Sequence, residues 1–229
     1  MEGIVPDLLG YGASDKPADA DLGIAAQAER LLAALLLIGW TGGTVVGHDI
    51  GGGVAQLLAL QDPRIEKLVL VDAIAYESFP EPGIARLKDP VWDSILGAPD
   101  FDLAKGLTKG FKRGMVNAER VTPDFIDAYE MPFRGVEGRR AYLRAARALR
   151  TEELSSRMEE VERLDIPTLV VWGAHDEFQP LANGSRLAAA IRHARMEVIE
   201  EAGHFLPEDA PERLADLILE FTTRQEATS

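Results

Sequence analysis

The sequence predicts an α/β fold, in which a mostly parallel sheet is flanked by helices. Short apolar runs with strand character alternate with helical patterns, at 44–46, 68–71, 168–172 and 196–199. The run Leu68–Val71 is apolar throughout, as is typical of a parallel strand covered on both faces. Between 77 and 165 the alternation stops, and the chain becomes helical, charged and rich in proline. We therefore expect a core formed by 1–76 and 166–229, with an inserted helical lid at 77–165.

Composition limits the functional classes. The 229 residues, 46% of them hydrophobic, can bury a substantial core. A net charge of −14 argues against nucleic acid or an anionic membrane as a partner, so we expect a small neutral organic substrate. With no cysteine there is neither a disulfide nor a thiolate metal site, and we expect no metal and no cofactor. No charged-then-apolar leader and no run of membrane-spanning length is present, so a cytoplasmic protein is expected.

The first elements are a short strand end, a loop and a helix. Ile4 and Val5 have strand character, and the glycine-punctuated loop that follows runs to Pro17. A helix is expected from about 21 to 38, ended by Gly39, with one apolar stripe formed by Ala28, Leu31, Leu32, Leu35 and Leu36. The crossover through this helix permits the stub at Ile4 and Val5 to pair with the strand at 44–46.

The stretch Val45–Gly53 predicts a sharp turn from a strand into a helix. Such a turn crowds the backbone, so residues two before and two after its tip must be small, as Gly47 and Gly51 are. This leaves Asp49 at the tip. Because aspartate is a favoured N-cap, a purely structural role as a helix cap is the alternative.

The sheet pattern resumes after residue 166. We expect a strand at 168–172, a helix at 181–192, a strand at 196–199 and a closing helix from Pro211. Asp176 and His204 lie in the loops that follow these two strands. Because the carboxyl ends of parallel strands share one edge, both side chains should converge there with Asp49.

These motifs resemble the α/β-hydrolase fold family. The resemblance rests on Gly10-Tyr11-Gly12, the turn Gly47-His48-Asp49-Ile50-Gly51, Trp172-Gly173 with Asp176, and Gly203-His204-Phe205. It implies a triad in the order nucleophile, acid, base, formed by Asp49, Asp176 and His204. Aspartate in place of the usual serine resembles the branch of haloalkane and haloacetate dehalogenases and epoxide hydrolases. Asp72 is the rival acid, because some similar dehalogenases place theirs after the preceding strand.

An aspartate nucleophile implies alkyl transfer rather than acyl transfer. A carboxylate is already ionised at neutral pH, and at an sp³ carbon it forms an ordinary ester. His204, oriented by Asp176, would activate water to hydrolyse that ester, and the backbone N–H of Ile50 would stabilise the oxyanion.

The leaving group is left open between a halide and an epoxide oxygen. The resemblance implies a tryptophan after the nucleophile in halide-releasing members, but the Ile50 side chain cannot donate a hydrogen bond. Tyr129 and Tyr142 are candidates to protonate an epoxide oxygen and Trp92 is a candidate to hold a halide, although core packing would explain each alone. A haloacetate would need arginines, and Arg134, Arg139 and Arg140 are most simply a solvated basic face.

A catalytically impaired scaffold or binding protein is the alternative function. Members of the resembled family carry three strands and a His-Gly oxyanion loop before the segment that opens this chain, so we expect a truncated sheet. Loss of one oxyanion donor costs about 10²- to 10³-fold in rate. An exposed sheet edge also invites homo-oligomers.

Overall fold

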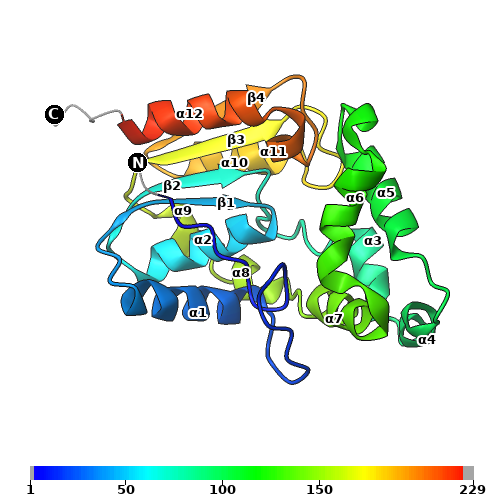
Figure 1. Ribbon diagram of the computed structural model, residues 1–229. Helices are drawn as coiled ribbons and strands as arrows, with labels where there is room; N and C mark the ends of the chain where they lie inside the picture. The colour runs from blue at the N-terminus through cyan, green and yellow to red at the C-terminus, as the bar shows by residue number, and fades with distance from the viewer. Residues whose placement is uncertain (1–2, 224–229) are drawn as a thin grey trace, which may run out of the picture.

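A computed structural model describes residues 3–223, which form one parallel sheet between layers of helices (Figure 1). The strand order is β1 (Gly43–His48), β2 (Ile65–Val71), β3 (Thr168–Gly173) and β4 (Ala194–Ile199). All three neighbouring pairs are parallel, with Val46 opposite Val69 and Val71 opposite Val171. The predicted α/β fold is therefore confirmed.

The alternation of side chains along the central strands explains the two helical layers. Leu68 and Leu70 of β2 join a buried cluster with α1 (Ile24–Leu37), α2 (Ile50–Gln61) and α10 (Leu181–Ala190). Val69 and Val71 point to the opposite face, where they pack with α11 (Leu206–Asp209) and α12 (Pro211–Thr223). The part of a strand that is buried on both faces must be apolar, as Leu68–Val71 of β2 is.

The segment 77–165 is helical, and most of it stands beside the carboxyl ends of the strands (Figure 1). Its elements are α3 (Pro82–Ala85), η1 (Arg86–Lys88), α4 (Val91–Gly97), α5 (Leu103–Gly114), η2 (Ala118–Arg120), α6 (Pro123–Glu130), η3 (Met131–Phe133), α7 (Gly135–Arg147), α8 (Glu152–Ser155) and α9 (Met158–Glu162). Leu154 of α8 and Val161 of α9 are buried in the core cluster that contains α2. The end of the segment thus packs on the core, and its division as a lid at 77 and 165 stays a prediction.

The N-terminal stub does not form the strand that the sequence suggested. No strand is assigned at Ile4 and Val5, whose side chains are 55% and 96% exposed. Pro6 follows directly and has no N–H for a strand ladder. The segment is held instead by Gln27, whose side chain accepts from the backbone N–H of Leu9 and donates to its carbonyl. Within residues 3–223, β1 pairs only with β2.

The predicted apolar stripe on α1 is right at its start and wrong at its end. Ala28 is fully buried, whereas Leu36 is 60% exposed. β1 is the edge strand of the sheet, and among the described residues no helix or strand packs over the last turn of α1. Of the helices described, none has both the length and the apolar character needed to cross a bilayer.

Candidate active site

Asp49 occupies the tip of the turn between β1 and α2 in an unfavourable backbone conformation. Its φ is 48° and its ψ is −116°, and such a conformation costs about 1–3 kcal/mol in a non-glycine residue. The carbonyl of Asp49 accepts hydrogen bonds from the N–H groups of Gly52 and Ile74, which hold the turn in place. The Asp49 side chain makes no capping hydrogen bond to α2. The Asp49 side chain therefore does not cap the helix, although the residue stands at its N-cap position.

Small residues are required on both sides of this turn, although not at every expected position. A Cβ atom on Gly47 would lie 2.3 Å from the Gly51 carbonyl oxygen, and one on Gly52 would lie 2.3 Å from the Ala73 Cβ. A Cβ on Gly51 would meet nothing within 4 Å. The prediction that Gly51 must be small is wrong, because the close approach to the sheet occurs one residue later.

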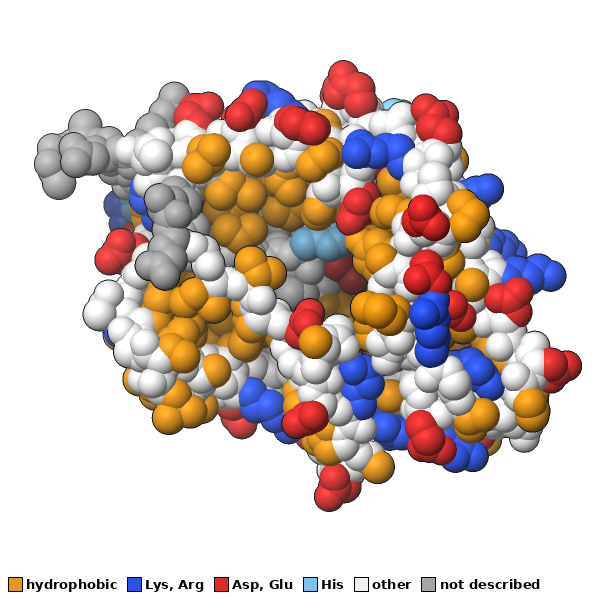
Figure 2. All heavy atoms as spheres, in the orientation of Figure 1, with side chains coloured by type: hydrophobic (Ala, Val, Ile, Leu, Met, Phe, Trp, Pro, Cys, Tyr) orange, Lys and Arg blue, Asp and Glu red, His pale blue; other side chains and the backbone are white. Residues whose placement is uncertain are grey.

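Asp49, Asp176 and His204 converge at the carboxyl ends of β1, β3 and β4. The Nε2 atom of His204 lies 3.8 Å from Oδ1 of Asp49, and its Nδ1 atom lies 2.9 Å from Oδ2 of Asp176. The Asp49 side chain is 30% exposed, whereas those of His204 and Asp176 are 6% and 0% exposed. Figure 2 shows a hollow in the surface with a histidine side chain at its edge and hydrophobic side chains around it. The geometry leaves the Asp49 carboxylate accessible and the other two groups enclosed.

Asp176, not Asp72, contacts the imidazole. One carboxylate oxygen of Asp176 accepts from the N–H groups of Phe178 and Gln179 at 2.7 and 2.8 Å, so the other is directed at His204. Asp72 is also buried, at the end of β2, but its hydrogen bond comes from the Gly173 N–H. Of the two carboxyl groups that the sequence analysis offered as the acid, Asp176 is therefore the one that hydrogen-bonds to His204.

The charges around His204 stabilise its protonated form. Burial by itself opposes the charge, but the hydrogen bonds and negative charges of Asp176 and Asp49 outweigh it and raise the pKa of His204 to about 10. For Asp49, burial acts to raise the pKa, but the neighbouring imidazolium of His204 outweighs it and lowers the pKa below its usual range. The resting site is therefore an imidazolium between two carboxylates.

His48 hydrogen-bonds to the backbone of His204. Its Nε2–H donates to the backbone carbonyl of His204 at 2.7 Å, and the two rings are 5.2 Å apart. Burial and the charge of His204 lower the pKa of His48, which keeps it neutral. This hydrogen bond ties the end of β1 to the loop that carries His204.

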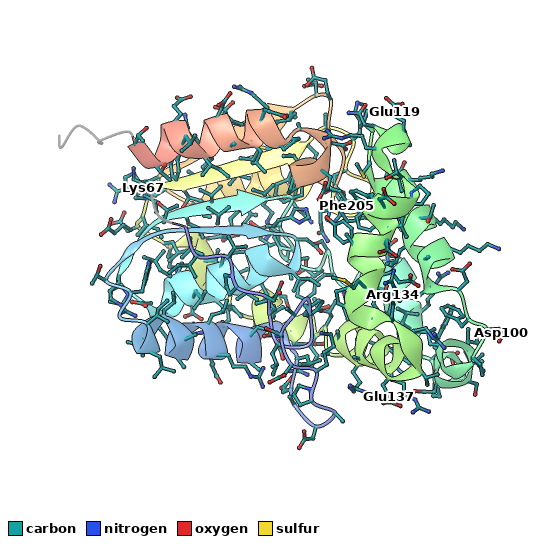
Figure 3. All side chains as sticks on the ribbon, viewed as in Figure 1. Lys67, Asp100, Glu119, Arg134, Glu137 and Phe205 are labelled. Atoms are coloured by element: carbon teal, nitrogen blue, oxygen red, sulfur yellow. The ribbon has the colours of Figure 1, made fainter. Side chains whose placement is uncertain are left out.

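Tyr129 lies in an aromatic cluster with Phe111 and Phe125. Its hydroxyl donates to Glu208, and its ring packs against Phe111 and Phe125. Phe205, which follows His204 and packs against Phe111, lies between the core and the helical segment (Figure 3). The structure thus gives Tyr129 contacts within this cluster and none that directs its hydroxyl to Asp49.

Tyr142 lies near a second tyrosine, Tyr11, which the sequence analysis did not select. The Tyr11 phenol is buried close enough to Asp49 and Tyr142 that burial, then these two groups, raise its pKa. Phe133 packs edge-on against both rings, at 6.4 Å from Tyr11 and 5.4 Å from Tyr142. The sequence feature that could have pointed to Tyr11 is the pair of glycines on either side of it. Gly10 and Gly12 adopt positive φ values, which turn the loop around Tyr11.

The remaining candidates are occupied within the helical segment. Trp92 packs in a hydrophobic cluster with Leu87 and Leu96. Arg139 is only 7% exposed and donates to the carbonyls of Leu96 and Ala98, so its assignment to a solvated basic face is wrong. Arg134 and Arg140 are about half exposed and form ion pairs with acidic neighbours, as a solvated face would. Among residues 3–223, no cluster of three or more histidine or acidic side chains could hold a metal ion.

Comparisons with known proteins agree with this architecture. Residues 2–211 match the model of the alpha/beta hydrolase fold family. The chain is 30% identical over 227 residues to a 2-hydroxymuconate semialdehyde hydrolase of Pseudomonas putida, covering 98% of this chain and 78% of the relative.

Two solved structures are similar over most of their length. An alpha/beta hydrolase fold protein from Burkholderia ambifaria superimposes with a TM-score of 0.83 at 27% identity, covering 93% of this chain and 78% of the other. A thermophilic esterase from Thermogutta terrifontis gives a TM-score of 0.74 at 25% identity, covering 94% and 77%. The fold, the strained turn and the match over most of the chain lead to one conclusion: this protein belongs to the alpha/beta hydrolase fold family.

Proposed function

We propose that this protein is a cofactor-independent hydrolase that forms an alkyl ester on Asp49 and then hydrolyses it. One observation carries the proposal: an accessible carboxylate stands at the tip of the strained turn, 3.8 Å from an imidazole that is itself bonded to Asp176. The relatives named above are hydrolases, which supports hydrolysis as the reaction class. The aspartate at the tip supports alkyl transfer within that class.

In the first step an oxygen of Asp49 attacks an sp³ carbon of the substrate. The new carbon–oxygen ester bond forms as the bond to the leaving group breaks, and the leaving group takes the electron pair. The backbone N–H of Ile50, which lies beside the Asp49 carboxylate, stabilises the second carboxylate oxygen. No base is needed, since the carboxylate is ionised.

In the second step water attacks the carbonyl carbon of the Asp49 ester. After the ester has formed, the resting His204 imidazolium gives its proton to the displaced leaving group or to solvent. The neutral imidazole then accepts one proton of the water, and Asp176 stabilises the imidazolium that results. Collapse of the tetrahedral intermediate breaks the ester bond, the leaving oxygen takes the second proton of the water, and an alcohol and the Asp49 carboxylate result.

The Tyr11 phenol near Asp49 favours an epoxide over a haloalkane as substrate. An epoxide leaves as an alkoxide that needs a proton, whereas a halide needs none. Tyr11 is close to the nucleophile, with Tyr142 beside it, so Tyr11 can donate its O–H to the leaving oxygen. Trp92, the candidate halide donor, is packed between the helices of the helical segment, where its ring lies under Arg86.

Intact mass spectrometry tests the proposal. The His204→Gln variant is incubated with styrene oxide or with a 1,2-dihaloalkane, because loss of the base should trap the ester. We expect a mass increase equal to the added alkyl group, with styrene oxide reacting faster. Asp49→Asn serves as the control and should show no adduct.

Absence of an adduct with either electrophile, in a folded protein, would contradict the proposal. It would favour the alternative of a scaffold or binding protein. An adduct that persists in Asp49→Asn would show that another residue is alkylated.

A further inference from the structure

Three carboxyl groups surround a single cation at the carboxyl edge of the sheet. Asp49, Asp72 and Asp176 follow β1, β2 and β3, and His204 is the group that balances them. The charged groups that face Asp72 are Asp176 and His204, with Asp49 and the neutral His48 beyond them. Burying an unpaired carboxylate costs several kcal/mol. Three carboxylates beside one imidazolium would leave more uncompensated negative charge in this buried cluster than two, so we expect the carboxyl group with the fewest hydrogen bonds to be neutral.

Hydrogen bonds identify which carboxyl group this is. Asp176 accepts three hydrogen bonds, from the imidazole and two backbone N–H groups, and therefore has no need of a proton. Asp49 faces the imidazole and the Ile50 N–H. Asp72 accepts only from Gly173, and its other oxygen, Oδ2, is fully buried with no partner. An oxygen deprived of both water and donors is stabilised most by a proton.

We propose that Asp72 holds the one carboxylic proton of this cluster and acts as a neutral positioning residue beneath Asp176, which leaves His204 free to become a base. The location of the proton concerns the resting protein alone. The effect on His204 rests on the proposed function, since only the ester-hydrolysis step needs a neutral imidazole. Burial and the nearby Asp176 raise the pKa of Asp72 to about 9, in agreement with a protonated group at neutral pH.

The backbone ties Asp72 directly to the acid of the triad. Asp72 has a φ of 40° and donates its N–H to the Val171 carbonyl, so its conformation is strained and held by the sheet. Its carboxyl accepts from the N–H of Gly173, and the Gly173 carbonyl accepts from the N–H of Asp176. A change at Asp72 is therefore transmitted to Asp176 through one residue.

Charge explains why neutrality matters for the reaction. An ionised Asp72 would add a second buried negative charge near His204 and favour the imidazolium at the stage where water must be deprotonated. A neutral carboxyl keeps the hydrogen bond to Gly173 and removes that charge. Asparagine reproduces the neutral form in size and in its hydrogen-bonding groups.

Infrared spectroscopy of the resting protein tests the location of the proton. Near neutral pH we expect a carbonyl stretch of a protonated carboxylic acid in the wild type and its loss in Asp72→Asn. The matched control is Asp62→Asn: Asp62 is also buried, but its ion pair with Arg64 lowers its pKa, so the band should remain. A band that persists in Asp72→Asn, or is missing from the wild type, would overturn the proposal.

The pH dependence of ester hydrolysis tests the positioning role. The rate of hydrolysis of the Asp49 ester should rise with pH as His204 loses its proton, and Asp72→Asn should show this rise at the same pH as the wild type, because asparagine leaves the charge near His204 unchanged. Asp62→Asn should also follow the wild type, whereas a rise shifted to lower pH in Asp72→Asn would show that Asp72 is ionised and overturn the proposal. A folded Asp72→Asn that is inactive at neutral pH would refute the role. The infrared measurement does not depend on alkylation of Asp49. Failure of the proposed function can therefore be distinguished from failure of the proposal that Asp72 holds the proton.

Discussion

Replacing Asp72 with asparagine should stabilise the protein, and increasingly so as the pH rises. The pKa of Asp72 is raised from 3.8 to about 9 in the folded protein. A group with a raised folded pKa contributes stability that is fully present below its unfolded pKa and is lost as the pH rises toward the folded one. Between these values the folded protein must keep a proton that the unfolded chain releases. Each pH unit therefore weakens folding by about 1.4 kcal/mol.

The size of the effect follows from this range. About three pH units separate the unfolded pKa of 3.8 from neutral pH. At neutral pH the free energy of unfolding of the wild type is therefore lower, by on the order of 4 kcal/mol, than that of a protein whose residue 72 never ionises. Asparagine does not titrate and keeps an acceptor for the Gly173 N–H. We expect Asp72→Asn to gain up to about 4 kcal/mol at neutral pH and close to nothing at about pH 4.

Urea unfolding followed by tryptophan fluorescence, repeated from about pH 4 to pH 9, measures this difference. Asp62→Asn should behave in the opposite way, because the pKa of Asp62 is lowered and its contribution to stability is present above 3.8. Parallel pH profiles for the wild type and Asp72→Asn, or a less stable Asp72→Asn at about pH 8, would refute the reasoning.

Three further predictions concern the surroundings of the site. Asp209→Asn should lower the free energy of unfolding by about 2–4 kcal/mol, because three backbone N–H groups of the helical segment and the His204 loop share its carboxylate; an unchanged melting temperature would contradict this. Gly47→Ala should cost about 3 kcal/mol or more in urea unfolding, whereas Gly51→Ala, with open space and a helical position, should cost nothing; equal effects would be the contrary result. Tyr11→Phe should slow alkylation by an epoxide about 10²- to 10⁴-fold and leave alkylation by a haloalkane unchanged in timed mass spectra; equal slowing would rule out proton donation.

Much of the active edge could be predicted because it depends on local sequence. The turn at Asp49 requires glycine before it, and a buried parallel strand must be apolar. Both features can therefore be recognised from a few neighbouring residues. The convergence of Asp49, Asp176 and His204 follows from a general property of parallel sheets, that their carboxyl ends share an edge. The distances of 3.8 and 2.9 Å between these groups required the structure.

The errors in prediction arise where distant parts of the chain decide burial. Arg139 is charged and lies in a helix, which favours an exposed position. Its guanidinium is nevertheless buried, because it donates hydrogen bonds to two carbonyls at the end of α4 and just beyond it. Tyr11 is separated by more than a hundred residues from Tyr142 in sequence, and only the fold brings them together. Whether the edge of β1, with Val46 47% exposed, binds a second copy stays a prediction.

The arrangement of charges lets the first step of the proposed reaction prepare the second. In the resting site the carboxylates of Asp49 and Asp176 raise the pKa of His204 to about 10, so the imidazole is protonated and cannot act as a base. Forming an ester on Asp49 removes the negative charge that lies 3.8 Å from Nε2, which lowers the affinity of His204 for its proton. A second buried carboxylate at Asp72 would cancel part of that decrease. The same neutral carboxyl that limits stability at alkaline pH would therefore let the imidazole become a base only after the nucleophile has reacted.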